Sequence, residues 1–211
     1  MKFPVLAMSD FFELEKELAS QGIVPVCGCD EAGAGPLAGP VCGAAVILPL
    51  DLEIPGLDDS KKLSEKKREA LYAFITENAL AWAVTSVEPD EIDEINILNA
   101  RLKSMEFAIR ALKVRPTFAL IDGDRNRGIS IPNETIVKGD SLVASIAAAS
   151  IVAKVSRDRI MCLYDSKYPK YGFAKHKGYG TTAHFAALRE YGSCAIHRQS
   201  FLKSLRRDVV K

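Results

Sequence analysis

The sequence predicts a layered α/β domain, and two patterns support this fold class. Short, almost wholly apolar runs bounded by Gly and Pro indicate strands that are buried on both faces. Longer stretches with apolar residues three and four positions apart indicate helices between these strands. The chain has 211 residues, 48% of them hydrophobic, so it can bury a core without help from disulfides, and one main domain is expected.

The first half of the chain contains three of the expected strands. A short amphipathic helix covers Asp10 to Gln21. Val24 to Leu48 then holds two strands around a turn of glycines and prolines. This turn fits a loose dinucleotide fingerprint, but a strand-like run follows where a helix should open, so nucleotide binding is not predicted. Ser64 is expected to cap a helix that reaches about Asn78, and Ala81 to Val87 is the third strand.

Two more strands alternate with helices in the second half. Pro89 to Glu94 begins an acidic helix and Ile97 to Leu112 forms a longer amphipathic one. Phe118 to Ile121 is a short buried strand, and Glu134 to Lys138 is the last strand. A long helix follows from Ser141 to about Tyr164, and its many small residues allow it to approach a sheet closely.

The region after this helix is aromatic and basic. Tyr168 to Thr182 alternates aromatic and cationic side chains with glycines, and Thr181 to Tyr191 is amphipathic. His176, His184 and His197 are scattered singly along the sequence, so structural or phosphate-contacting roles are favoured over metal ligation.

The net charge of +1 hides a strong asymmetry. Residues 1–100 hold 7 Lys and Arg against 18 Asp and Glu, whereas residues 101–211 hold 21 against 9. A basic half favours a polyanionic partner such as nucleic acid, although most charge runs are only solvated surface.

Cysteine usage and hydropathy indicate a cytoplasmic protein. Cys27, Cys29 and Cys42 fall inside apolar strands, Cys162 and Cys194 are isolated, and no zinc-ligand spacing is found. Buried, reduced thiols are therefore expected. No apolar run reaches membrane-spanning length, and the first residues lack the pattern of a signal peptide.

Four carboxylates occur at the ends of expected elements. Asp30 and Glu31 follow the first strand, Asp122 follows the fourth, and Asp140 precedes the long helix, where a helix cap is the commoner role. Clustered carboxylates repel one another, and a divalent cation relieves this repulsion. Oxygen ligands favour Mg²⁺ or Mn²⁺. Because adjacent strand residues point to opposite faces, the first strand is expected to end or bulge at Glu31.

Eight motifs resemble those of bacterial type 2 ribonuclease H (ribonuclease HII), and the likeness runs from about Gly22 to Phe201. They are Cys-Asp-Glu-Ala-Gly-x-Gly-Pro-Leu-Ala-Gly-Pro-Val, Asp-Ser-Lys-Lys-Leu-Ser, Glu-Ile-Asp-Glu-x-Asn-Ile-Leu-Asn-Ala, Leu-Ile-Asp-Gly, Lys-Gly-Asp-Ser, Ile-Ala-Ala-Ala-Ser-Ile-Val-Ala-Lys-Val-x-Arg-Asp, Tyr-Gly-Phe-Ala-Lys-His-Lys-Gly-Tyr and His-Arg-x-Ser-Phe. One such motif is weak, but eight in the same order are specific.

The resemblance implies a ribonuclease H-like fold: a central mixed five-stranded sheet flanked by helices, with a small helical C-terminal part. Residues 1–190 would form the catalytic domain with its N-terminal helix, and 191–211 a basic segment packed on it. The implied activity is endonucleolytic cleavage of RNA in RNA/DNA hybrids, and cleavage 5′ of single ribonucleotides in duplex DNA, as in ribonucleotide excision repair. A monomer is expected.

By the same resemblance, Asp30, Glu31, Asp122 and Asp140 take the positions of the four catalytic carboxylates, which hold two Mg²⁺ or Mn²⁺ ions. The backbone of Gly33-Ala34-Gly35 and the side chain of Tyr179 would read the ribose and the RNA-to-DNA junction, and Lys61 would contact a phosphate.

One residue departs from the family pattern. The family usually has arginine between the two glycines where this chain has Ala34, which puts affinity and junction selectivity in doubt but not the metal chemistry. Three alternatives stay open. They are a type 3 ribonuclease H, for whose additional N-terminal domain the sequence has no room, another metal-dependent nuclease of the same fold, and a catalytically weak hybrid-binding module.

Overall fold

A five-stranded mixed sheet forms the centre of the protein. The computed structural model describes residues 11–58, 60, 61 and 63–203. The strands are β1 (Val26–Ala32), β2 (Val41–Ile47), β3 (Ala81–Val87), β4 (Phe118–Asp122) and β5 (Asn133–Ile136), in the order β3-β2-β1-β4-β5. The first three strands pair antiparallel, whereas β4 lies parallel to both β1 and β5. The predicted sheet is confirmed.

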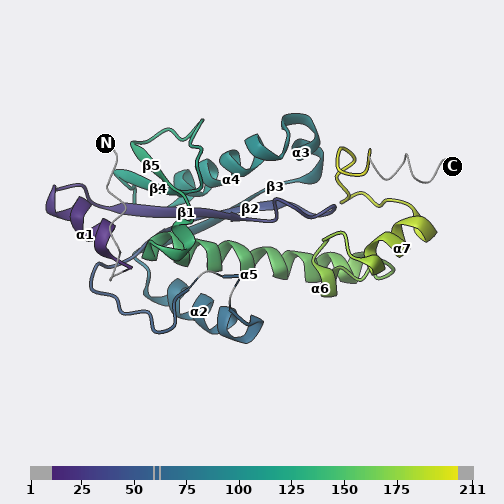
Figure 1. Cartoon of the computed structure of the whole chain (residues 1–211), viewed down its shortest axis with the longest axis horizontal. Coiled ribbons are helices and arrows are strands. Elements are labelled where there is room, and N and C mark those ends of the chain that lie inside the picture. The colour runs from purple at the N-terminus through teal and green to yellow at the C-terminus, as the bar shows by residue number, and fades with distance from the viewer. Residues whose placement is uncertain (1–10, 59, 62, 204–211) are drawn as a thin grey trace.

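Helices cover both faces of this sheet. Figure 1 shows the long helix α5 (Ala144–Lys167) along one face with α2 (Glu65–Asn78) outside it, and α4 (Ile97–Ala111) along the other face. The remaining helical elements are α1 (Glu13–Ser20), α3 (Pro89–Ile95), the 3-10 turn η1 (Gly139–Ser141), α6 (Phe173–His176) and α7 (Thr182–Tyr191). The predicted cap of α2 is present, because the Ser64 side chain accepts a hydrogen bond from the Lys67 amide.

Two glycines in the central strands let the covering helices come close. A Cβ on Gly28 of β1 would lie 2.2 Å from the backbone carbon of Ser145 in α5. A Cβ on Gly43 of β2 would lie 2.4 Å from the backbone carbon of Ser104 in α4. The small residues of α5 are buried against the sheet, as the sequence predicts.

The predictions for two helix starts are wrong. The first helix begins at Glu13 and not at Asp10, which lies outside the described residues. The long helix begins at Ala144, after the separate turn η1, so Asp140 does not cap it. Glu15 of α1 occupies that role, because its carboxylate accepts from the Ser145 amide at 2.9 Å and from the Ser145 hydroxyl at 2.7 Å.

The C-terminal part of the chain packs against one end of α5 and against the loop between β1 and β2 (Figure 1). Its core joins Ala38 from that loop and Met161 from α5 to Tyr171, Phe173 and Ile196. Among the described residues, no helix is long and apolar enough to cross a bilayer. All five cysteines are free thiols, and the Sγ atoms of the buried Cys27 and Cys29 lie 3.8 Å apart.

Candidate active site

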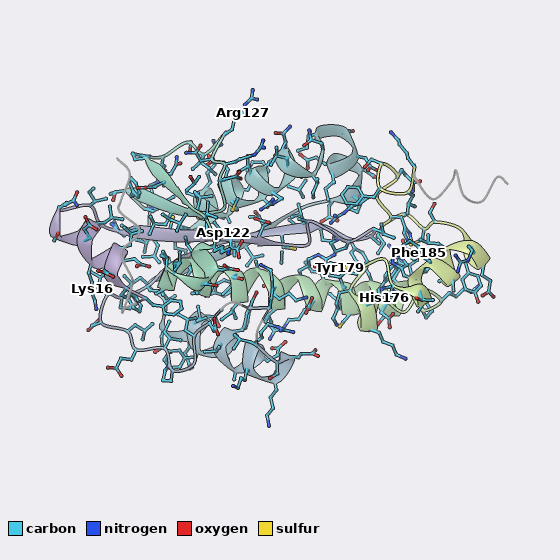
Figure 2. All side chains as sticks on the ribbon, in the orientation of Figure 1. Lys16, Asp122, Arg127, His176, Tyr179 and Phe185 are labelled. Atoms are coloured by element: carbon cyan, nitrogen blue, oxygen red, sulfur yellow. The ribbon has the colours of Figure 1, made fainter. Side chains whose placement is uncertain are left out.

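Asp30 and Asp122 lie side by side on neighbouring strands. The pairing of β1 with β4 ends at Cys29 and Ile121, and each aspartate is the next residue on its strand. Figure 2 shows Asp122 near the middle of the molecule. Burial, followed by the charges of Glu31 and Asp122, raises the pKa of Asp30 well above its ordinary value. The close approach of these acids therefore creates a site where negative charge is unfavourable without a cation.

Glu31 reaches the site from the same strand without the predicted bulge. Strand β1 continues in regular register through Ala32, with Glu31 opposite Gly43 of β2. The expectation that it ends or bulges at Glu31 is therefore wrong. Strand β4 stops at Asp122, so Glu31 of β1 lies beyond the end of β4. At this position β4 is no longer a barrier between the two faces of the sheet. Burial raises the pKa of Glu31, and the positive charge of Arg101, whose Nε lies 2.6 Å from Glu31 Oε1, opposes this rise.

Asp140 completes the group of four from the turn η1. Its Oδ2 accepts from Lys61 Nζ at 3.2 Å, and the carboxylate is buried whereas the Lys61 side chain is 78% exposed. The pKa of Asp122 is raised by burial and by the charge of Asp140, while the amides of Asp140 and Gly139 lower it. The turn thus brings a third acidic segment beside the ends of β1 and β4.

The donor atoms of this acidic group fit a hard divalent cation. Within the described residues, the buried atoms Glu31 Oε2 and Asp122 Oδ1 have no hydrogen-bond partner, and leaving such atoms unpaired costs free energy. Carboxylate oxygens are the ligands that Mg²⁺ and Mn²⁺ prefer. Among all the residues that the structure describes, no three His, Cys, Asp or Glu side chains are already arranged to hold a metal ion. The carboxylates of Asp140 and Glu31 instead face Lys61 and Arg101, so closing around an ion requires them to turn from these partners.

The residues predicted to read the ribose lie together beside the C-terminal part. A Cβ on Gly35 would be 3.6 Å from Tyr179 Cε1. Tyr179 is 45% exposed, and Figure 2 shows it between Asp122 and the labelled residues of α6 and α7. The loop and the tyrosine are held together by the hydrogen bond from the Leu37 amide to the Gly178 carbonyl at 2.8 Å.

Sequence reasoning missed three arginines. Arg101 pairs with Glu31, and the buried Arg157 and Arg198 donate to carbonyls of the loop between β1 and β2. Both buried arginines occur within the motifs Val-x-Arg-Asp and His-Arg-x-Ser-Phe. Composition assigns such residues to a basic surface, and only the fold shows that they are internal.

The three histidines are also not isolated. The rings of His176 and His184 stack with centroids 4.5 Å apart, and His184 Nε2 lies 3.0 Å from His197 Nε2. Although they are scattered singly along the sequence, the three histidines are therefore neighbours in the fold. The turns after α5 bring them together around Phe173, whose ring contacts all three.

Comparison with known proteins gives one consistent result. The family model described as ribonuclease HII matches residues 27–204. A ribonuclease HII of Geotalea uraniireducens is 53% identical, over 94% of this chain and 92% of its own length. The crystal structure of the ribonuclease H2 from Pyrococcus horikoshii is 27% identical with a TM-score of 0.68, and the match covers 83% of this chain and 92% of that one. The structure of the PCNA:RNase HII complex from Archaeoglobus fulgidus is 26% identical with a TM-score of 0.69, over 82% and 93% of the two chains.

The fold and the acidic site therefore define a nuclease of the ribonuclease H-like class. The chain belongs to the ribonuclease HII family, as its motifs indicated. It is accordingly a ribonuclease H, an enzyme that acts on RNA/DNA hybrids.

Proposed function

We propose that this enzyme cleaves on the 5′ side of single ribonucleotides embedded in duplex DNA, as well as within RNA/DNA hybrids, with Asp30, Glu31, Asp122 and Asp140 as its catalytic carboxylates. One observation carries the proposal. Asp30, Glu31, Asp122 and Asp140 come from three separate segments and lie close enough for their charges to act on one another, and two of their buried oxygens lack a partner among the described residues.

The four carboxylates would hold two Mg²⁺ or Mn²⁺ ions. Asp30 would be shared between the ions, Asp140 would hold one of them, and Glu31 and Asp122 would hold the other. Such ions, when bound, activate the attacking water and stabilise the leaving 3′-oxygen. The role of the chain is to keep this carboxylate group buried and in place: the Glu31 amide donates to Asp30 Oδ1 at 2.7 Å, and the Glu31 amide and the Ser150 hydroxyl both act to lower the pKa of Asp30, against the rise that burial causes.

Recognition is assigned to the surface formed by Gly35 and Tyr179. The backbone amides of Gly33-Ala34-Gly35 would donate to the 2′-hydroxyl, the group that distinguishes RNA from DNA. The exposed ring of Tyr179 would pack on the next deoxyribose, which has no 2′-oxygen to obstruct it. Lys61 lies at the rim of the site with its side chain largely exposed, a position suited to a phosphate contact.

The test uses duplex DNA that carries one ribonucleotide, in Mg²⁺ or Mn²⁺. Asp30→Asn and Asp122→Asn are each expected to abolish cleavage while duplex binding stays measurable, because each change removes charge needed to hold an ion. Asp158→Asn is the matched control: Asp158 is a half-buried acid like Asp122, but it pairs with Lys154 at 2.7 Å on α5.

Three results would count against the proposal. Retained turnover in Asp30→Asn or Asp122→Asn would refute the assignment of the carboxylates. Cleavage only within long RNA tracts would instead favour a type 3 specificity. Binding without cleavage by the unmodified protein would favour a hybrid-binding module.

A further inference from the structure

Arg198 holds the loop that contains the predicted ribose-reading residues. Its guanidinium donates to the carbonyl of Gly33 at 2.6 Å, to that of Ala34 at 3.0 Å and to that of Gly39 at 3.0 Å. The side chain is completely buried. A planar guanidinium with donors in a fixed fork suits three carbonyls at once, and a lysine ammonium lacks this fork.

These hydrogen bonds determine where two backbone amides point. In a planar trans peptide, the N–H of one residue points opposite to the C=O of the residue before it. Because the carbonyls of Gly33 and Ala34 point inward to Arg198, the amides of Ala34 and Gly35 point away from it. Within the described part of the chain, neither amide donates a hydrogen bond. Gly35 is exposed and Ala34 is half-buried, so both donors face the surface on which Tyr179 lies.

The position of Arg198 is itself fixed by the C-terminal segment. Its amide donates to the Leu37 carbonyl at 2.9 Å, and the Gly39 amide donates to the Ile196 carbonyl at 2.8 Å. The ring of Phe201 lies 5.1 Å from the guanidinium carbon. The segment is therefore joined to the loop by an isolated antiparallel bridge, with Ala38 opposite His197.

The buried charge of Arg198 is directed at peptide groups. Burial, followed by the positive charge of Arg157, lowers the pKa of Arg198 to about 9, so the neighbouring guanidinium does not stabilise this cation. A cation that donates its hydrogen bonds to peptide carbonyls polarises those peptides, and their N–H groups become stronger donors.

We propose that Arg198 is a positioning residue for ribose discrimination, which aims the amides of Ala34 and Gly35 at the 2′-hydroxyl of the substrate. The inference rests on the proposed function, since it requires that these amides contact the ribose. It explains how the loop keeps its donors in place although Ala34 supplies no side chain for a phosphate.

Arg157 provides a matched control within the same loop. It is also buried, and it too donates to three carbonyls, those of Ala38, Pro40 and Lys177. The amides that follow two of these carbonyls are already used inside the protein: that of Gly39 donates to Ile196, and that of Gly178 to His176 Nδ1. Arg157 therefore stabilises the loop without aiming a donor at the substrate surface.

The experiment measures binding without chemistry. Two duplexes of identical sequence, one all DNA and one with a single ribonucleotide, are titrated with the full-length protein in Ca²⁺. The discrimination is the dissociation constant of the all-DNA duplex divided by that of the duplex with the ribonucleotide. Arg198→Lys is expected to lower this ratio about tenfold, because two aligned donors to one hydroxyl are lost. Arg157→Lys is expected to leave the ratio unchanged, since loss of folded protein affects both duplexes equally.

Phe201→Leu is the second variant, and it serves if Arg198→Lys does not fold. It removes the ring beside the guanidinium but keeps the arginine, and it should lower the ratio by a smaller factor. An unchanged ratio in a folded Arg198→Lys protein would overturn the inference. If Arg198→Lys does not fold, an unchanged ratio in Phe201→Leu would overturn it. An unmodified protein that binds both duplexes equally would instead refute ribose reading by this surface, and with it the recognition part of the proposed function.

Discussion

The hydrogen bonds of His184 and His197 predict that acid weakens the C-terminal part of the protein. His197 Nδ1 lies 2.9 Å from the Cys194 amide and accepts from it, so the ring proton is on Nε2, which donates to His184 Nε2 at 3.0 Å. His184 Nδ1 in turn donates to the Tyr179 carbonyl at 3.0 Å. The chain of bonds needs two neutral rings, because a proton added to His184 Nε2 would face the donor of His197.

The size of the effect follows from His197. Burial, followed by the charge of His184, lowers its pKa from 6.5 to about 4. As the pH falls below 6.5, the unfolded chain takes up a proton that the folded protein does not, so stability present above pH 6.5 is lost progressively down to about pH 4. The loss is about 1.4 kcal/mol per pH unit, or about 2 kcal/mol at pH 5 relative to pH 7. The side chain is only 1% exposed, so solvent screening does not reduce this value much.

Urea unfolding of the unmodified protein and of His197→Gln at pH 7 and pH 5 measures the effect. Other groups, including Asp30 with its raised pKa, contribute equally to both proteins and cancel in the comparison. The unmodified protein should lose about 2 kcal/mol more than the variant between the two pH values. Equal losses would show that His197 is not kept neutral by the fold.

Two further predictions follow from the loop and the sheet. Gly28→Val should lower the free energy of unfolding by roughly 3 kcal/mol or more, because even a Cβ at this position would lie 2.2 Å from the α5 backbone. Gly35→Ala is the control, since its Cβ would meet only Tyr179 at 3.6 Å. Equal stability of the two variants would contradict the packing argument. Ala34→Arg adds a cation at the half-buried edge of the loop and should tighten duplex binding, measured by titration, with little change in maximal turnover; weaker binding would count against a phosphate near this position.

Much of the site could be predicted because its parts are local. Asp30, Glu31 and Asp122 stand where apolar strands end or lose a partner, and glycines mark the loop that follows. Strand ends are visible in a sequence because apolar runs stop there. The error at Glu31 arose because the strand alone suggested a bulge, whereas the early end of the neighbouring strand β4 removes the need for one.

Asp140 shows where local reasoning fails. A carboxylate before a helix of small residues is typical of a cap, but three residues separate Asp140 from the first residue of α5, and Glu15 from α1 fills the capping position. Capping of α5 by Glu15 depends on a contact between residues 130 positions apart in the chain. No periodicity or propensity contains such information.

The sequence by itself determined the sheet, its covering helices, the family and the four acids, because hydrophobic period and motif order are properties of neighbouring residues. Only the tertiary structure decided which cations face these acids, that the three histidines meet, and that two arginines of a basic half lie buried against carbonyls of one loop. The physical reason is that a buried charged side chain needs a hydrogen-bonding or oppositely charged partner, and the fold brings that partner from a distant part of the chain.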